Sequence, residues 1–201
     1  MAITDSIHAG NKVVAIASST GGPKALQAFL PLLPGNLNAP VLIVQHMPSG
    51  FTKALAERLD QMSALSVKEA EEGDILKKGC VYIAKGGSHM TVVKHGHDHR
   101  IHYIDDPPRE GVKPCANFMY ESLIDSSYDS VVCAVLTGMG MDGTVGIKNL
   151  KQKKPIVIYV QDKESSTVFG MPGSIVREGL VSNGLPLPAI AHEIAKNVGV
   201  N

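Results

Sequence analysis

The chain has 201 residues, of which 44% are hydrophobic and 19% charged, and its 19 basic residues are balanced by 19 acidic ones. This length and composition are typical of one globular domain with its own core, and a zero net charge argues against a nucleic-acid-binding protein, which normally carries a basic patch. No apolar run reaches the roughly 18 residues needed to span a bilayer, and the polar N-terminus lacks the apolar core of a signal peptide.

Strands and helices alternate along the chain, and no Pro/Gly/Ser-rich linker divides them. The strands are rich in β-branched residues, as expected of strands covered on both faces, and the helices carry apolar residues at helical spacing. In the helix at 49–62 these residues are Phe51, Leu55, Leu59 and Met62. In chain order we predict a strand at 12–18, a helix at 22–33, a strand at 39–45, a helix at 49–62, a strand at 79–84, a hairpin at 90–105, a helix at 114–125, a strand at 129–137, a helix at 141–152, a buried strand at 154–160 and a helix at 186–198.

This order of elements predicts an α/β fold. Buried strands that alternate with helices form a doubly wound, mostly parallel sheet with helices on both faces, and the hairpin at 90–105 is an antiparallel insertion. In such sheets, ligands bind at the carboxyl ends of the strands. We expect a single domain over residues 12–201, preceded by a tail or linker remnant at residues 1–11.

Three of the predicted strands end on residues with reactive side chains. "IASST" places Ser18 or Ser19 at a strand-to-helix turn, "IVQHM" places His46 just past a strand, and "VLTGMGMDG" places Asp142 in a glycine-rich turn. If the sheet is parallel, the three side chains project from one edge. A serine hydroxyl needs a base to take its proton, imidazole titrates near neutral pH, and a carboxylate can orient the imidazole. The arrangement therefore suggests nucleophilic catalysis.

Each of these turns also has a structural interpretation. "ASSTGGP" could cap a helix or bind a phosphate, although it matches neither GxxxxGK[ST] nor GxGxxG, and the chain has no GxSxG elbow. His46 could be a structural residue at a strand end, and Asp142 could be a cap in a glycine-rich turn. From the residues alone, catalysis and phosphate binding both stay open.

Several longer segments resemble one known family. "IASSTGGPKAL", "VQHMPSGFTKALAERL" and "LTGMGMDGTVGIKNL" are similar to the catalytic domain of the chemotaxis-receptor protein-glutamate methylesterase (CheB) family, and the likeness covers roughly residues 12–190. It continues through "EAEEGDILKKGCVYIAKGGSHM", "DDPPREGVKPCANFMYESL" and "FGMPGSIVREGLVSNGLPL". The order and spacing of these segments make the resemblance specific.

The resemblance implies a serine esterase that uses no metal and no organic cofactor. It assigns Ser19 as nucleophile, His46 as base and Asp142 as the acid of the triad. It places the oxyanion site at backbone N–H groups near Met139, with Thr20 as a further contributor whose hydroxyl could also hold His46. The implied reaction is hydrolysis of glutamate methyl esters, with release of methanol through an acyl-enzyme, and deamidation of particular glutamines. The implied partners are methyl-accepting chemotaxis receptors, at their helical cytoplasmic region.

The chain departs from the family pattern in three places. Ala17-Ser18 replaces the usual Gly-Ala before the nucleophile, and Cys115-Ala116-Asn117 replaces a frequent Ser-x-Asp. We expect these changes to leave the triad alone and to bear on substrate preference, with Cys115 acting as a small packing residue. The phospho-receiver domain and linker that usually precede the family's catalytic domain are not in this sequence, so it is either an excised domain, for which a receiver domain is a further partner, or a free-standing one.

Three rival functions follow from the same sequence: a nucleotide-binding module, a non-catalytic domain that docks on receptor helices, and a hydrolase of small soluble esters. The histidine-rich "KHGHDHRIH" is interpreted as a solvated hairpin tip and not as a metal site. Three widely separated cysteines without a CxxC pair favour a reduced, cytoplasmic protein: Cys80, Cys115 and Cys133.

Overall fold

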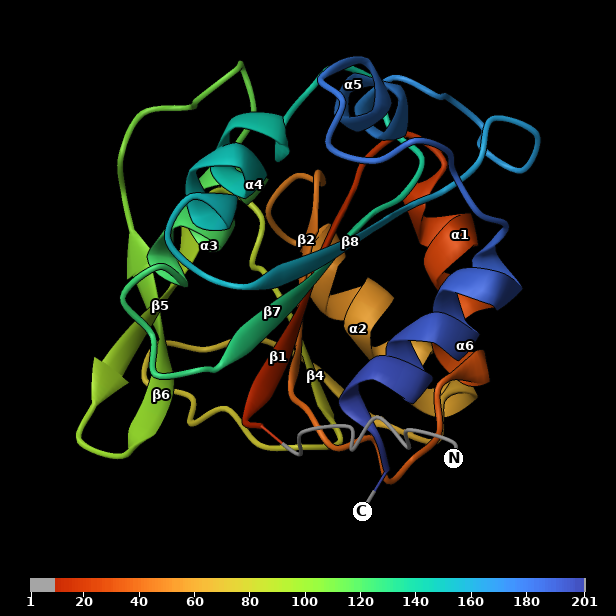
Figure 1. The fold of residues 1–201 in the computed structure, drawn as a ribbon. Coiled ribbons are helices and arrows are strands. Elements are labelled where there is room, and N and C mark those ends of the chain that lie inside the picture. Colours follow the sequence, from red (N-terminus) through yellow and green to blue (C-terminus); the bar gives the residue numbers. More distant parts are fainter. Residues whose placement is uncertain (1–9, 201) are drawn as a thin grey trace.

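The computed structural model describes residues 10–200, and its centre is a sheet of six parallel strands (Figure 1). The chain fills this sheet outward from β1, first toward β2 and β4 and later in the opposite direction toward β7 and β8, which confirms the predicted doubly wound sheet. No helix within residues 10–200 has the length and apolar character needed to cross a membrane. The strand order is β3 (Ser66–Glu69), β4 (Cys80–Ile83), β2 (Val41–Gln45), β1 (Lys12–Ser18), β7 (Ser130–Val135) and β8 (Ile156–Val160).

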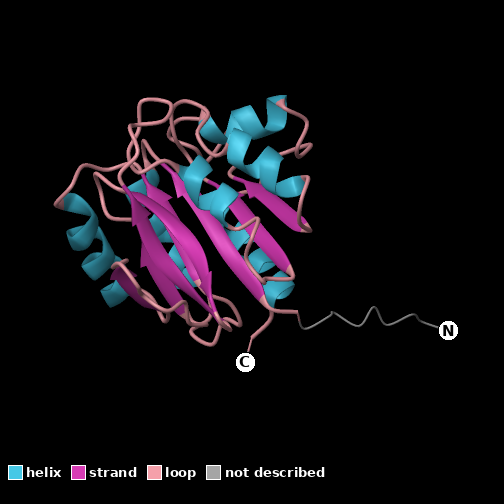
Figure 2. Ribbon diagram, turned by 90° about the vertical axis from the view of Figure 1, so that its left-hand side faces the viewer, coloured by secondary structure: helices cyan, strands magenta, loops and turns pink. Residues whose placement is uncertain are grey.

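Both faces of the sheet are covered, as Figures 1 and 2 show. Side chains alternate between the faces of a strand, so Val14 and Ile16 of β1 enter one core while Val13, Ala15 and Ala17 enter the other. The first core is closed by α1 (Gly22–Phe29), α2 (Phe51–Met62) and α6 (Leu187–Val198). The second is closed by α3 (Ala116–Ser122), α4 (Thr144–Lys151), α5 (Met171–Arg177) and the hairpin of β5 (His89–His95) and β6 (Asp98–Ile104).

The hairpin was predicted correctly, but several boundaries and two elements differ from expectation. β5 and β6 form a separate antiparallel sheet of their own. α1 ends at Phe29, and a 3₁₀ turn, η1 (Leu30–Leu32), follows, because Pro31 cannot donate a helical hydrogen bond. β8 lies at the sheet edge and is only half-buried along most of its length, contrary to the expected buried strand. We did not predict β3 or α5 from the sequence. The predicted tail at 1–11 lies almost entirely outside the described residues.

The apolar face of α2 is rotated from the one we predicted. Leu55 and Leu59 are buried, but Phe51 is 61% exposed and Met62 is 45% exposed. The buried face is completed by Thr52 and Ala56. At about 100° per residue, Phe51 and Met62 lie roughly a quarter turn from the centre of that face, and they are the first and last residues of the helix.

One histidine of the "KHGHDHRIH" segment, His99, is buried, contrary to the expected solvated tip. The ring of His99 stacks on Tyr128 at 4.1 Å between centroids, and its Nε2 accepts a hydrogen bond from the backbone N–H of Ser127 at 3.0 Å. Burial lowers the pKa of His99, and the positive charges of Lys94 and Lys154 lower it further. Neutral His99 is therefore the form that this packing favours.

We expect acid to destabilise the fold through His99. Because its folded-state pKa lies below the usual value of 6.5, the unfolded chain binds the proton first, so stability is lost as pH falls from about 6.5 through the lower folded-state value. Urea unfolding at about pH 7.5 and about pH 5.5 measures this loss. The loss should shrink in His99→Gln and persist in His97→Gln, whose side chain is exposed in the hairpin turn. Equal losses in all three proteins would contradict the assignment.

Candidate functional site

The sheet brings the ends of three neighbouring strands to one level. β1 lies between β2 and β7, with Ser18 opposite Gln45 and Ala17 opposite Val135. Beyond the last pairs, the backbone N–H of Ser19 donates to Thr137 O at 3.0 Å, and that of His46 donates to Ser18 O at 3.1 Å. The predicted residues Ser19 and His46 therefore lie at the same carboxyl edge, which is the upper edge in Figure 1.

The turn after each of these strands uses the same local device. A glycine in the left-handed conformation immediately precedes the next helix: Gly21 before α1 (φ 80°), Gly50 before α2 (φ 90°) and Gly143 before α4 (φ 96°). Positive φ is costly for residues with a side chain and readily adopted by glycine. This explains why "STGG", "MPSG" and "MDG" each follow a strand: the chain must reverse sharply there to begin a helix.

The structure separates the two candidate serines. The Ser18 hydroxyl is fully buried and donates to Gln45 Oε1 at 2.7 Å, whereas Ser19 is partly exposed. Gln45 Nε2 in turn donates to the carbonyls of Ser19 at 3.0 Å and His46 at 3.1 Å. Gln45 thus ties the two turns together, a role the sequence reading missed although a glutamine ending a buried apolar strand signals a specific partner.

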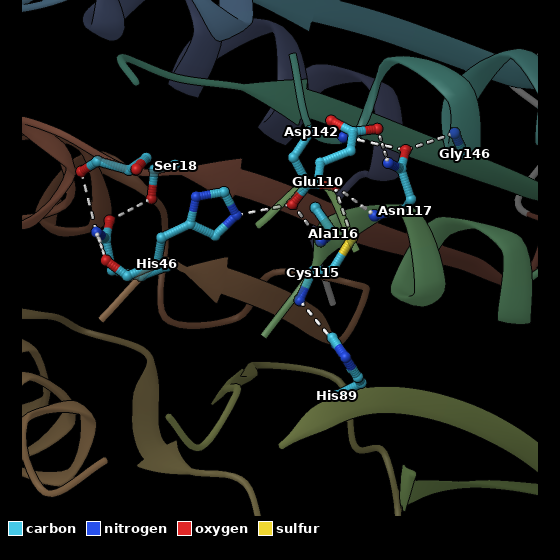
Figure 3. A network of polar contacts seen from close by, with 12 residues as sticks. Ser18, His46, His89, Glu110, Cys115, Ala116, Asn117, Asp142 and Gly146 are labelled. Carbon is cyan, nitrogen blue, oxygen red and sulfur yellow. Dashed lines mark hydrogen bonds and ion pairs between the residues drawn. The ribbon is translucent and has the colours of Figure 1, made fainter. Parts of the chain in front are cut away.

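His46 and Asp142 form a close pair (Figure 3). Nε2 of His46 lies 2.7 Å from Oδ2 of Asp142, and the carboxylate is 3% exposed. Burial is the largest single influence on Asp142 and opposes its ionisation, but hydrogen bonds from His46, Cys115 and Ala116 together outweigh it and lower its pKa. An ionised carboxylate can only accept, so in the neutral imidazole Nε2 carries the proton and Nδ1 has the lone pair.

Asp142 is held by the first turn of α3. The N–H of Ala116 donates to Oδ2 at 2.6 Å, and the N–H of Asn117 donates to Oδ1 at 3.0 Å. Both are N-terminal donors that a helix leaves unpaired, and the helix end favours negative charge. The Cys115 thiol completes the shell with a 3.0 Å hydrogen bond to Oδ1. Cys115 is therefore more than a packing residue, and the expectation that this segment makes no contact with the predicted triad is wrong, because it binds Asp142 directly.

Asn117 makes the reciprocal connection to α4. Its Oδ1 accepts from Gly143 N at 3.1 Å and from Gly146 N at 2.7 Å, while its Nδ2 donates to Glu110 Oε1 at 2.8 Å. Asp142 thus caps α3 from the turn before α4, and Asn117 caps α4 from within α3. This role is hard to predict from the sequence, since Asn117 lies inside a predicted helix, where a capping role is unusual.

The remaining predicted residues, Thr20 and Met139, border Ser19. Met139 is 72% exposed, and its neighbour Gly138 packs so closely on Ser19 that a Cβ there would lie 2.9 Å from the serine Cβ. Within residues 10–200, the N–H groups of Thr20, Gly21 and Met139 have no hydrogen-bond acceptor. In the same part of the chain, neither the Ser19 hydroxyl nor His46 Nδ1 has a hydrogen-bond partner. The Thr20 hydroxyl makes no hydrogen bond to His46 in this part of the chain.

The described residues also bear on metal binding. Across residues 10–200, no three His, Cys, Asp or Glu side chains are grouped so as to hold a metal ion. The three cysteines are all free, and the side chains around Asp142 are donors directed at its oxygens. The chemistry available at this edge is that of a hydroxyl, an imidazole and a buried carboxylate.

This geometry defines an α/β protein with its functional site at the carboxyl edge of the central strands. A family model described as CheB methylesterase matches residues 14–194. The crystal structure of the Thermotoga maritima CheB methylesterase catalytic domain is similar, with a TM-score of 0.88 and 40% sequence identity over 92% of this chain and 98% of that one. The chain belongs to the CheB methylesterase family.

Longer relatives carry the same domain. A protein-glutamate methylesterase/protein-glutamine glutaminase of Geobacillus kaustophilus is 43% identical over 187 residues, which cover 93% of this chain and 54% of the relative. One from Archaeoglobus fulgidus is 43% identical over 183 residues, which cover 91% and 52%. This chain therefore spans about half the length of the curated relatives it matches.

Removing the Asn117 side chain, which caps α4, should lower the stability of the protein. Asn117→Ala leaves two buried N–H groups without an acceptor, so we expect the free energy of unfolding to fall by about 2–4 kcal/mol. The matched control is Asn149→Ala, which removes an amide in α4 that donates to half-buried Glu121, and should cost less than about 1 kcal/mol. Urea unfolding of both variants tests this prediction. Equal losses of unfolding free energy would show that the Asn117 cap contributes no more to stability than the Asn149 hydrogen bond.

Proposed function

We propose that this chain is a catalytic domain that hydrolyses methyl esters of glutamate side chains by a serine mechanism. The observation that carries the proposal is the buried, ionised Asp142 bonded to Nε2 of His46, which directs the lone pair of Nδ1 away from the carboxylate, at the edge where Ser19 lies. The names of the relatives, protein-glutamate methylesterase/protein-glutamine glutaminase, support the same activity.

The first half of the reaction forms an acyl-enzyme. Ser19 Oγ attacks the ester carbonyl while His46 Nδ1 takes the hydroxyl proton. The imidazolium that results donates from Nε2 to Asp142, whose charge stabilises it and whose position fixes the tautomer. The tetrahedral intermediate then collapses, the C–O bond to the methoxy group breaks, and His46 returns the proton to the leaving group as methanol.

The developing oxyanion needs fixed donors. The unpaired N–H groups of Met139 and Thr20 border Ser19, and Thr20 lies two residues before α1, close to the helix end that carries partial positive charge. Donors that are fixed before the reaction cost no reorganisation, and losing one typically slows a reaction by about 10²–10³-fold. We assign the oxyanion site to these backbone groups.

The second half restores the enzyme. Water replaces methanol and attacks the acyl carbonyl while His46 takes a proton from it. The ester bond to Ser19 Oγ then breaks, His46 returns the proton to that oxygen, and the glutamate side chain leaves as a carboxylic acid that ionises to the carboxylate. A glutamine amide would pass through the same intermediate and release ammonia, which accounts for the second activity in the relatives' names. In this cycle the Ser19 hydroxyl, the His46 imidazole and the Asp142 carboxylate perform every acyl and proton transfer, with water as co-substrate, so the proposed mechanism uses no metal or organic cofactor. The proposed substrates are the helical cytoplasmic regions of methyl-accepting chemotaxis receptors.

Replacement of the nucleophile should abolish turnover. We expect Ser19→Ala to lower methanol release from a methylated receptor cytoplasmic fragment by at least about 10³-fold. Ser18→Ala is the matched control and should lose less than about tenfold, because it removes one buried hydrogen bond to Gln45 and no reacting group. Equal release from wild type and Ser19→Ala would remove Ser19 as nucleophile. Binding of the fragment without release by the wild type would indicate a docking domain.

The acid of the triad has a separate test. In Asp142→Asn, the amide can donate to His46 Nε2 and so favour the tautomer with its proton on Nδ1, facing the serine. The same change in a serine protease triad lowers kcat by about 10⁴-fold, and we expect a loss of that order here. Asp129→Asn, at the opposite end of β7, is the control and should keep the wild-type rate. A wild-type rate in Asp142→Asn would refute the tautomer argument.

A further inference from the structure

The side chains around Asp142 include one that the mechanism above does not use. Cys115 is fully buried, and its Sγ lies 3.0 Å from Oδ1, the carboxylate oxygen that does not face His46. Three donors that are not imidazole reach this carboxylate, and two of them are backbone N–H groups. The thiol is therefore the one side-chain donor besides His46 that the described residues direct at Asp142 (Figure 3).

We propose that Cys115 is a positioning residue, whose thiol orients the Asp142 carboxylate and withdraws charge from it through Oδ1, and thereby sets how strongly Oδ2 attracts the proton of His46. This inference rests on the proposed function only for its kinetic readout. The inference rests on the different partners of the two carboxylate oxygens. Oδ2 accepts hydrogen bonds from His46 and Ala116, whereas Oδ1 accepts them from Cys115 and Asn117.

The direction of the S–H bond follows from the charges. Burial, followed by the neighbouring charge of Asp142, raises the pKa of the Cys115 thiol well above its usual range, so the sulfur keeps its proton and donates. The position of the thiol is also fixed from the other side, because the N–H of Cys115 donates to Nδ1 of His89 at 3.0 Å, and Nε2 of His89 contacts the carbonyl of Pro107 at 3.2 Å. Cys115 is thus held on both sides.

Only two ionisable side chains among the described residues bond to the Asp142 carboxylate, those of His46 and Cys115. His46 approaches it from the end of β2, Cys115 from the turn before α3, and the hydroxyl of Tyr120 lies below in the core, bonded to backbone carbonyls. Two further groups contact residues that hold Asp142 and not Asp142 itself: His89 contacts Cys115, and Glu110 contacts Asn117. Arg109 lies one step further away, paired with Glu121. Removing the thiol should therefore act on the Asp142–His46 pair without a second titrating neighbour to compensate.

Loss of the thiol leaves more charge on Oδ2 and stabilises protonated His46. For Cys115→Ala we expect the acid limb of the pH–rate profile for ester hydrolysis to move to higher pH by about half a unit, the size of one weak hydrogen bond. At pH values on the acid limb, the rate of Cys115→Ala should be about threefold lower than that of the wild type. Cys115→Ser restores a donor at the same place, so its acid limb should return to the wild-type position or below.

Cys133→Ala is the matched control. Cys133 is equally buried, in the middle of β7, and within the described residues its thiol has no hydrogen-bond partner. Both alanine variants lose a buried sulfur and some stability, but only Cys115→Ala should move the acid limb. An unchanged limb in Cys115→Ala, or an equal movement in Cys133→Ala, overturns the proposal.

A second readout keeps this test separate from the proposed function. The ring signals of His46 can be titrated by NMR in wild type, Cys115→Ala and Cys115→Ser without any turnover. If the wild type releases no methanol, the proposed esterase activity fails, yet an upward shift of the His46 midpoint in Cys115→Ala would still support the positioning role. If the wild type is active but neither the limb nor the NMR midpoint moves, the positioning role fails alone.

Discussion

The site depends on one buried charge. Asp142 is ionised although it is almost fully enclosed, and a buried carboxylate persists only when donors replace its lost hydration. His46, Cys115, Ala116 and Asn117 supply those donors. Because the carboxylate can only accept, it determines which imidazole nitrogen holds the proton and which one is free for chemistry. The tautomer at the sheet edge is thus a consequence of the N-terminus of α3.

Two kinds of scaffold meet at this edge. Parallel strands fix Ser19 and His46, since the register of β1, β2 and β7 and the bridging amide of Gln45 leave little freedom to the residues that follow. Asp142 is fixed by the reciprocal caps between α3 and α4. Groups placed on rigid elements and supported by a second layer of hydrogen bonds keep the geometry that catalysis requires.

This arrangement reaches a familiar set of functional groups by its own route. The order along the chain is serine, histidine, aspartate, which differs from the Ser–Asp–His order of α/β hydrolases. The histidine contacts the carboxylate through Nε2, whereas the serine protease triad uses Nδ1 for that contact. The proposed roles therefore rest on which atoms face each other in this protein and not on the fold class, because one fold hosts many functions.

The sequence by itself determined the alternation of strands and helices, the parallel sheet and the three strand ends with reactive residues. These are local patterns: runs of β-branched residues, helical spacing and glycines that allow a sharp turn. It did not reveal β3, which is short and polar, or α5, which contains both proline and glycine, and it put Phe51 and Met62 in the core. Only the tertiary structure separated Ser18 from Ser19 and brought Cys115 and Asn117 to Asp142, because those contacts join segments about 25 residues or more apart, and the pairing of distant hydrogen-bonding groups leaves no period in the sequence.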